Sequence, residues 1–164
     1  MDRREKLSRV AIAALIGAVI VQNPPFPRRS DPPGSGRRDT VSASTGFILP
    51  AKGRITKAGE RISISGNLGD PVVAAANGVV IKSQWDDSGE GLGQMIVIRH
   101  NHLDKLTIYA HNHKRLVNTG QRVQRGDAIA QMGATGKSSH NHLRFEIRDA
   151  NGRALNPCNF VPCP

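Results

Sequence analysis

From residue 45 onward, the apolar residues of this chain fall into short runs separated by turn-forming residues. No stretch there repeats apolar residues at i, i+3, i+4 and i+7 for three turns, the pattern that a helix packed against a core would show. Asn77-Gly78 lies between two apolar runs, and this dipeptide is a strong signal for a two-residue β-hairpin turn. The 17 glycines suit many tight turns. The sequence therefore predicts a β-rich domain.

All six histidines lie in three identical His-Asn-His triplets, at residues 100–102, 111–113 and 140–142. Each triplet adjoins a strand-like run, so two imidazoles would share one face of a strand if the triplet kept regular β structure. Such pairs suggest a metal site or a proton-transfer site. His102 and His113 each follow an apolar run and precede a polar stretch, so we expect these two in loops.

Residues 1–22 have the features of an export segment. Residues 1–9 have a net positive charge, and residues 10–21 form an unbroken apolar run that is short for a helix crossing about 30 Å of hydrocarbon. Because no Ala-x-Ala cleavage site follows, this segment is either a cleaved signal peptide or an uncleaved inner-membrane anchor; a buried core helix of a cytoplasmic protein is a third interpretation. Export would place the domain in the periplasm or on the outer face of the cytoplasmic membrane.

Residues 23–44 are predicted to be a disordered linker. Residues 23–39 hold five of the ten prolines and few apolar side chains, so burial would not offset the entropy lost on ordering them. The 23 Lys and Arg residues against 13 Asp and Glu give a net charge of +10, which favours anionic partners. Nucleic acid is not expected among them, because one Trp, one Tyr and four Phe leave few rings for base stacking.

Cys158 and Cys163 enclose a short loop at the C-terminal end of the sequence. In an oxidising compartment a pair so close would form a disulfide that holds the tail, which we favour over two free thiols. Two thiols alone do not make a cysteine zinc site.

The order of motifs from residue 53 to residue 157 resembles the LytM domain of lysostaphin-like metallopeptidases. The matching segments are residues 53–56, 62–66, 69–81, 93–100, 107–111, 120–136, 142–148 and 155–157. The resemblance implies a compact, all-β and mostly antiparallel domain with a groove, here over residues 45–164. It also implies an exported protein that cuts or manages the peptide cross-links of peptidoglycan.

The resemblance indicates that the zinc ligands of the active members are absent from this chain. Those members hold zinc with a His-x-x-x-Asp motif and with the second histidine of a His-x-His motif. Counting back from Gly69-Asp70 places Gly59 and Ser63 at the first two ligand positions, and Phe145 fixes a register that places Arg144 at the third.

The positions of two catalytic helper histidines are retained. Tyr109-Ala110-His111 matches the Tyr-x-His motif of the family, and His142 matches the first histidine of His-x-His. Tyr109, His111, His142 and Arg144 would then line the groove.

No cofactor is expected at this site. Glycine has no side chain, a serine hydroxyl is a poor neutral ligand, and a guanidinium stays protonated and repels a cation. One alternative keeps zinc: His111, His140 and His142 could form a three-histidine site if their strands bring them together. Otherwise His140 is a solvated loop residue.

The sequence therefore resembles the catalytically degenerate LytM proteins, which activate separate cell-wall amidases at division sites. On this interpretation the chain is not an enzyme, and its groove receives a segment of an amidase or another peptidoglycan hydrolase, with acidic groups that match the local positive charge. One alternative is an active zinc endopeptidase that cleaves peptidoglycan peptides. Another is a passive module that binds the cell wall.

Overall fold

The computed structural model describes residues 46–163 of the chain. The segments predicted for export, residues 1–22, and for the linker, residues 23–44, lie outside the described residues. Within the described part, no helix is long and apolar enough to cross a membrane. The one helical element of this part is a 3-10 turn, η1 (Pro157–Asn159).

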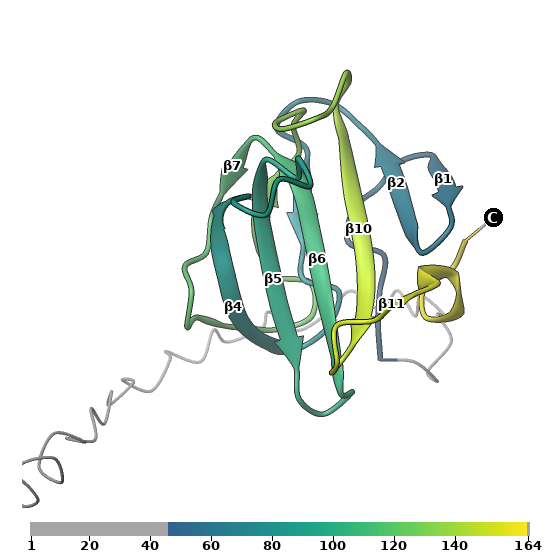
Figure 1. Ribbon diagram of the computed structural model, residues 1–164, viewed down its shortest axis with the longest axis vertical. Coiled ribbons are helices and arrows are strands. Elements are labelled where there is room, and N and C mark those ends of the chain that lie inside the picture. Colours follow the sequence, from purple (N-terminus) through teal and green to yellow (C-terminus); the bar gives the residue numbers. More distant parts are fainter. Residues whose placement is uncertain (1–45, 164) are drawn as a thin grey trace, which may run out of the picture. The chain divides into compact units, whose positions relative to one another are not determined.

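The described residues form two antiparallel sheets, which confirms the predicted all-β fold. In the main sheet the strands lie in the order β1-β2-β10-β6-β5-β4-β8. The short strand β11 pairs with β10 at Ile147 and Arg148. Figure 1 shows β4, β5, β6 and β10 side by side. The strands of this sheet are β1 (Ile55–Ala58), β2 (Arg61–Ser65), β4 (Gly78–Trp85), β5 (Gln94–His100), β6 (Lys105–Asn112), β8 (Arg122–Val123), β10 (His142–Asp149) and β11 (Ala154–Leu155).

A small second sheet lies in the order β3-β9-β7. Its strands are β3 (Pro71–Val73), β9 (Ala128–Gln131) and β7 (Lys114–Arg115). The main core contains side chains from both sheets, including Ile62, Ile98 and Phe145 from the main sheet and Val72 and Ile129 from the small one. All five are fully buried, so each contributes about 1.5–3 kcal/mol of hydrophobic stabilisation.

The dipeptide Asn77-Gly78 does not close a hairpin, contrary to the sequence prediction. The strands on either side of it, β3 and β4, belong to different sheets and do not pair with each other. Long-range contacts decide this turn: the Asn77 carbonyl accepts from Nδ1 of His100 at 2.8 Å, and its Oδ1 accepts from the Arg125 N–H at 2.7 Å. These contacts direct the chain from one sheet to the other.

The main sheet has a second face, turned away from the core, which we call the outer face. Alternation along β10 places Leu143, Phe145 and Ile147 in the core and the side chains of residues 142, 144, 146 and 148 on the outer face. A small apolar cluster lies beside them and consists of Met95 and Val97 of β5, Ile108 and Ala110 of β6, and Leu92 of the loop before β5.

The loop between β4 and β5 is held by one carboxylate. Asp86 accepts hydrogen bonds from the hydroxyl and the N–H of Ser88 and from the N–H of Leu92. These bonds, the Ser88 hydroxyl first, lower the pKa of Asp86 to about 2. The loop thereby brings Leu92 into the apolar cluster of the outer face.

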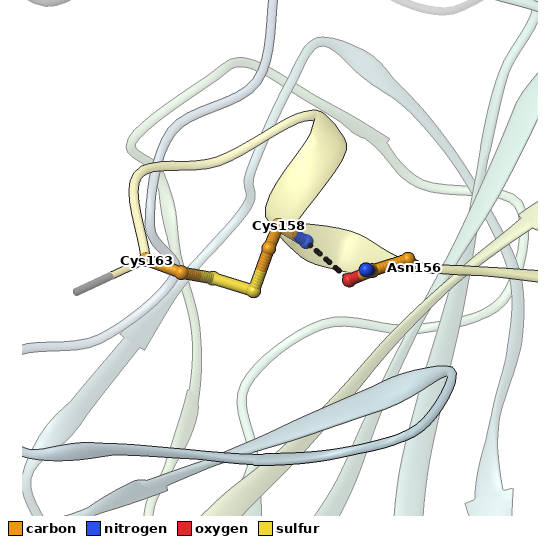
Figure 2. Close-up of a disulfide and its surroundings, with 3 residues drawn as sticks. All are labelled: Asn156, Cys158 and Cys163. Carbon is orange, nitrogen blue, oxygen red and sulfur yellow. Dashed lines mark hydrogen bonds between the residues drawn. A yellow bond between two sulfur atoms is a disulfide. The ribbon is translucent and has the colours of Figure 1, made fainter.

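The C-terminal segment is closed by a disulfide between Cys158 and Cys163, drawn in Figure 2. The side chain of Asn156 accepts a hydrogen bond from the Cys158 N–H and so caps the start of η1. Cys158, Phe160 and Cys163 pack against the main core, and Val161 is buried in it. The bridge therefore fixes a segment that covers one edge of the core.

Candidate functional site

The three positions that would hold the family's zinc ligands lie on two neighbouring strands and the turn before one of them. Gly59 is exposed in the two-residue turn between β1 and β2, with φ of 63° and open space where a Cβ would stand. Ser63 of β2 and Arg144 of β10 are direct cross-strand partners, and Ala110 of β6 is the partner of Arg144 on its other side. Partners in register present their side chains on the same face, so Arg144 lies at the centre of the outer face between Ser63 and Ala110.

Arg144 is fixed by an ion pair with the residue two positions along β10. Its Nε and Nη2 both donate to Oε1 of Glu146, at 2.8 and 2.5 Å. The other oxygen of that carboxylate accepts from Nε and Nη2 of Arg148, at 3.2 and 2.8 Å. Arg148 also lies 3.9 Å from the Glu90 carboxylate.

Glu146 is the buried member of this network, with a side chain only 4% exposed. Burial alone raises the pKa of its carboxyl, but the hydrogen bonds and charges of Arg148 and Arg144 outweigh burial, and the net pKa is lowered. Glu146 therefore stays ionised at neutral pH, and one carboxylate holds two guanidinium groups on the outer face.

His111 and His142 meet across the pair of β6 and β10 at one end of the outer face. Their ring centroids are 4.8 Å apart. Nδ1 of His111 lies 2.8 Å from the Thr135 carbonyl, and Nδ1 of His142 lies 3.1 Å from the His140 carbonyl. A carbonyl only accepts, so in both rings Nδ1 bears the proton and the neutral Nε2 is left with a lone pair.

Both imidazoles are neutral at neutral pH. Burial is the largest cause that lowers the pKa of His111, and His142, when it is protonated, and the charge of Arg144 lower it further. Burial also lowers the pKa of His142, with the charges of His140 and Arg144 acting in the same direction. Over the described residues, neither Nε2 makes a hydrogen bond, so both remain as acceptors for a partner group.

Tyr109 does not line this surface, and its predicted place in the groove is wrong. Its side chain is fully buried on the core side of β6, where the Ala75 N–H donates to its hydroxyl at 2.9 Å. An extra residue in β6 shifts the register between β5 and β6 after Tyr109, and His111 has φ of 65° at this bulge. The bulge breaks the alternation, so Tyr109 and His111 point to opposite faces of the sheet.

The remaining histidines have separate environments. His140 is exposed in the loop before β10, and its ring stacks on that of His142 with centroids 4.7 Å apart. His102 and His113 are exposed outside the strands. His100 is buried, with Nδ1 bonded to Asn77 and Nε2 at 2.8 Å from the Thr107 hydroxyl. The three triplets thus do not form three equivalent pairs of imidazoles.

A comparison of the sequence with models of known protein families finds a match to peptidase family M23 over residues 50–157 of the chain.

The chain belongs to peptidase family M23.

Among curated relatives in this family, the chain is similar to two proteins with NlpD names. It is 36% identical over 140 residues to a lipoprotein NlpD/LppB homolog of Pseudomonas aeruginosa, a match that covers 79% of this chain and 45% of the relative. It is 38% identical over 117 residues to the murein hydrolase activator NlpD of Escherichia coli, with 71% of this chain and 30% of the relative covered. The chain thus spans less than half the length of these relatives.

Two solved structures of family M23 peptidases resemble the described fold. The catalytic domain of lysostaphin from Staphylococcus simulans has a TM-score of 0.58 and 27% sequence identity, over 67% of this chain and 87% of that chain. A zinc containing peptidase from Vibrio cholerae has a TM-score of 0.61 and 29% identity, over 68% of this chain and 39% of that chain.

The residues at the family's ligand positions do not fit a zinc ion. Gly59 offers no donor atom, Ser63 offers a neutral hydroxyl, and Arg144 brings a positive charge. Over the part of the chain that the structure describes, no group of three or more His, Cys, Asp or Glu side chains is arranged to hold a metal ion. The ring of His142 packs against the rings of both His111 and His140, with centroids 4.8 and 4.7 Å apart.

Glu146 and Arg148 are members of the site that were not predicted from the sequence. The signal was present, because residues 142, 144, 146 and 148 alternate along one strand and therefore share a face. What the alternation could not give is the pairing of both arginines with one carboxylate, since that depends on rotamers and burial.

Proposed function

We propose that this chain is an exported regulator of peptidoglycan hydrolysis, which acts by binding a peptidoglycan hydrolase, in particular a cell-wall amidase, on its outer face. The observation on which the proposal rests is the ion pair of Arg144 and Glu146 at the centre of that face, where the family's third zinc ligand would stand. A fixed cation at this point cannot activate water as a metal does, but it can donate hydrogen bonds to a partner.

The relatives support a regulatory role. Two of the matched sequences, from Escherichia coli and Salmonella typhimurium, have the name murein hydrolase activator NlpD, with 38% and 35% identity to this chain. Because the chain covers only about a third of those proteins, the activity of the whole relatives comes to it as a proposal. Export, to the periplasm or to the outer face of the cytoplasmic membrane, follows from the same proposal, because peptidoglycan lies outside the cytoplasm.

The chemistry of the outer face indicates what the partner presents. The charge of Arg144 is already balanced by Glu146. The acidic partner group that the sequence suggested therefore gains less electrostatic binding free energy here than it would beside an unpaired cation. Arg144 keeps further N–H donors, and the Nε2 atoms of His111 and His142 are acceptors. Donors and acceptors side by side match the C=O and N–H groups of a partner's main chain, so we propose that the partner segment binds through its backbone.

The test is hydrolase activation by matched variants. The purified chain is mixed with a cell-wall amidase and dye-labelled peptidoglycan, and release of dye is measured for wild type, Arg144→Ala and Arg153→Ala. Arg153 is exposed in the turn between β10 and β11, at the other end of β10, so it serves as the control. We expect activation by wild type and Arg153→Ala and its loss in Arg144→Ala, with all three proteins folded by circular dichroism. Equal activation by all three would overturn the outer face as the contact surface, and no activation of any hydrolase would overturn the regulatory function.

The alternative is an active zinc endopeptidase. It is favoured by one observation, that His111 and His142 both donate Nδ1–H to carbonyls as metal-bound histidines commonly do. Release of peptide fragments from peptidoglycan by the chain alone, inhibited by a chelator, would establish it in place of the regulatory function.

A further inference from the structure

Trp85, the one tryptophan of the chain, is 55% exposed at the end of β4. An indole ring offers both a flat apolar face and an N–H donor, and tryptophan is enriched at binding interfaces for this reason. The main core and the outer-face site both form without it, so its position calls for a separate explanation.

Trp85 adjoins a small cavity on the side of the main sheet opposite to Arg144. Gln94 of β5 is its direct cross-strand partner, so the two side chains share a face. Along β5, Ile96 and Ile98 lie in the core, and alternation places Gln94 on that same inner side. The cavity is therefore distinct from the surface proposed for the hydrolase.

The cavity has a volume of about 240 Å³. Its lining residues are Gln94, His113, Lys114, Arg115, Val117 and Asn118. The wall opposite β5 is fixed to β4 near Trp85: the Ser83 hydroxyl donates to the Val117 carbonyl at 2.6 Å, and the Arg115 guanidinium donates to the Ser83 carbonyl. The walls are thus held in place without a ligand.

The polar groups of this cavity suit a ligand with many hydroxyl and amide groups. Gln94 and Asn118 are amides, which both donate and accept hydrogen bonds. No acidic side chain is among the described lining residues, and Lys114 supplies a cation.

We propose that Trp85 and this cavity form a binding site for a saccharide that bears a carboxylate. The flat face of an indole ring packs on the C–H face of a sugar ring, the amides hydrogen-bond its hydroxyl and acetamido groups, and Lys114 pairs with the carboxylate. The volume is below the roughly 300 Å³ at which pockets for drug-sized ligands begin, so the cavity admits one sugar ring and leaves the rest of the ligand outside. A site of this kind holds the chain on glycan while the outer face remains free.

The test compares two disaccharides by isothermal titration calorimetry with the full chain. One is N-acetylglucosamine linked to N-acetylmuramic acid, and the other is two linked N-acetylglucosamines, which lack the carboxylate. We expect the first to bind more tightly, and its binding to change the fluorescence of the wild-type protein, in which Trp85 is the one indole.

Variants assign the contacts. Trp85→Ala should weaken binding of both sugars by about tenfold or more, as expected for loss of a stacking ring. Lys114→Ala should remove the preference for the sugar with the carboxylate. Lys82→Ala is the control, because Lys82 is exposed on β4 but its partner Val97 belongs to the outer face.

The outcomes separate this site from the proposed regulatory function. Trp85→Ala should still activate a hydrolase in solution, because Arg144 lies on the other face of the sheet. Binding of both sugars unaffected by Trp85→Ala, or no binding at all, would overturn the saccharide site and leave the regulatory function standing. A stronger fluorescence response to a single-stranded oligonucleotide than to either sugar would also overturn it, in favour of nucleic acid.

Discussion

Ser63 and Arg144 are direct partners across β2 and β10, so two of the three positions that the sequence resemblance assigned to zinc ligands face each other on the outer face. These two positions carry a hydroxyl and a guanidinium. The guanidinium is held by the buried carboxylate of Glu146, which gives the position a fixed positive charge.

The first prediction concerns metal content. The purified protein should contain zinc at no more than trace levels, because Gly59, Ser63 and Arg144 remove the three family ligands. Elemental analysis after dialysis against metal-free buffer measures this. One equivalent of zinc in wild type that disappears in His142→Ala would contradict the prediction and support the three-histidine alternative.

The second prediction concerns the ligand positions themselves. Replacing Gly59 by His, Ser63 by Asp and Arg144 by His should give the chain a measurable affinity for zinc, because the family's ligand set would then stand beside His142. A side chain at Gly59 has space but must adopt φ near 63°, which costs about 1 kcal/mol. Zinc titration of the triple variant checks this, with Gly59→Ala, Ser63→Ala and Arg144→Ala combined as the control. If both triple variants fail to bind zinc, the backbone no longer keeps the geometry of the metal site.

The third prediction concerns the carboxylate between the arginines. Glu146→Gln should lower the free energy of unfolding by roughly 3 kcal/mol, because it leaves two partly buried guanidinium groups without their shared anion. Glu90→Gln, at an exposed carboxylate 3.9 Å from Arg148, should cost under about 1 kcal/mol. Urea unfolding of the two variants compares them, and equal effects would mean that the buried network adds nothing to stability.

The fourth prediction concerns pH and His100. Burial lowers the pKa of this imidazole below its ordinary value of 6.5, so the folded state binds a proton less readily than the unfolded state does. The stability that His100 contributes is therefore present above pH 6.5 and is lost as the pH falls below it. Urea unfolding between pH 8 and pH 5 should show this loss in wild type and a shallower one in His100→Gln, in which the group cannot titrate. Parallel curves would show that another group governs the dependence.

The fifth prediction concerns the C-terminal bridge. Cys158→Ser combined with Cys163→Ser should destabilise the domain by about 2 kcal/mol or less. The effect is small because closing a short loop removes little conformational entropy from the unfolded chain. Thermal unfolding measures the loss, and mass spectrometry of the wild-type protein from the exported compartment shows the state of the thiols. Two free thiols without reductant would count against both the bridge and export.

Some features of this protein were determined by sequence alone. The absence of helical periodicity predicts a β fold, and the order of motifs indicates the family, because both are patterns along the chain. The prediction that Gly59, Ser63 and Arg144 replace zinc ligands likewise rests on residue types in a linear motif. None of these inferences requires knowing which strands pair.

The tertiary structure decided which side chains meet. A single extra residue in β6 turns His111 away from the face of Tyr109, and long-range bonds to Asn77 replace an expected hairpin with a crossing between sheets. The pairing of Arg144 with Glu146, the contact of His111 with His142, and the cavity beside Trp85 likewise depend on neighbouring strands and their register. The physical reason is that alternation gives the face of a side chain only within one unbroken strand, whereas bulges, register and strand order are set by packing between residues distant in sequence.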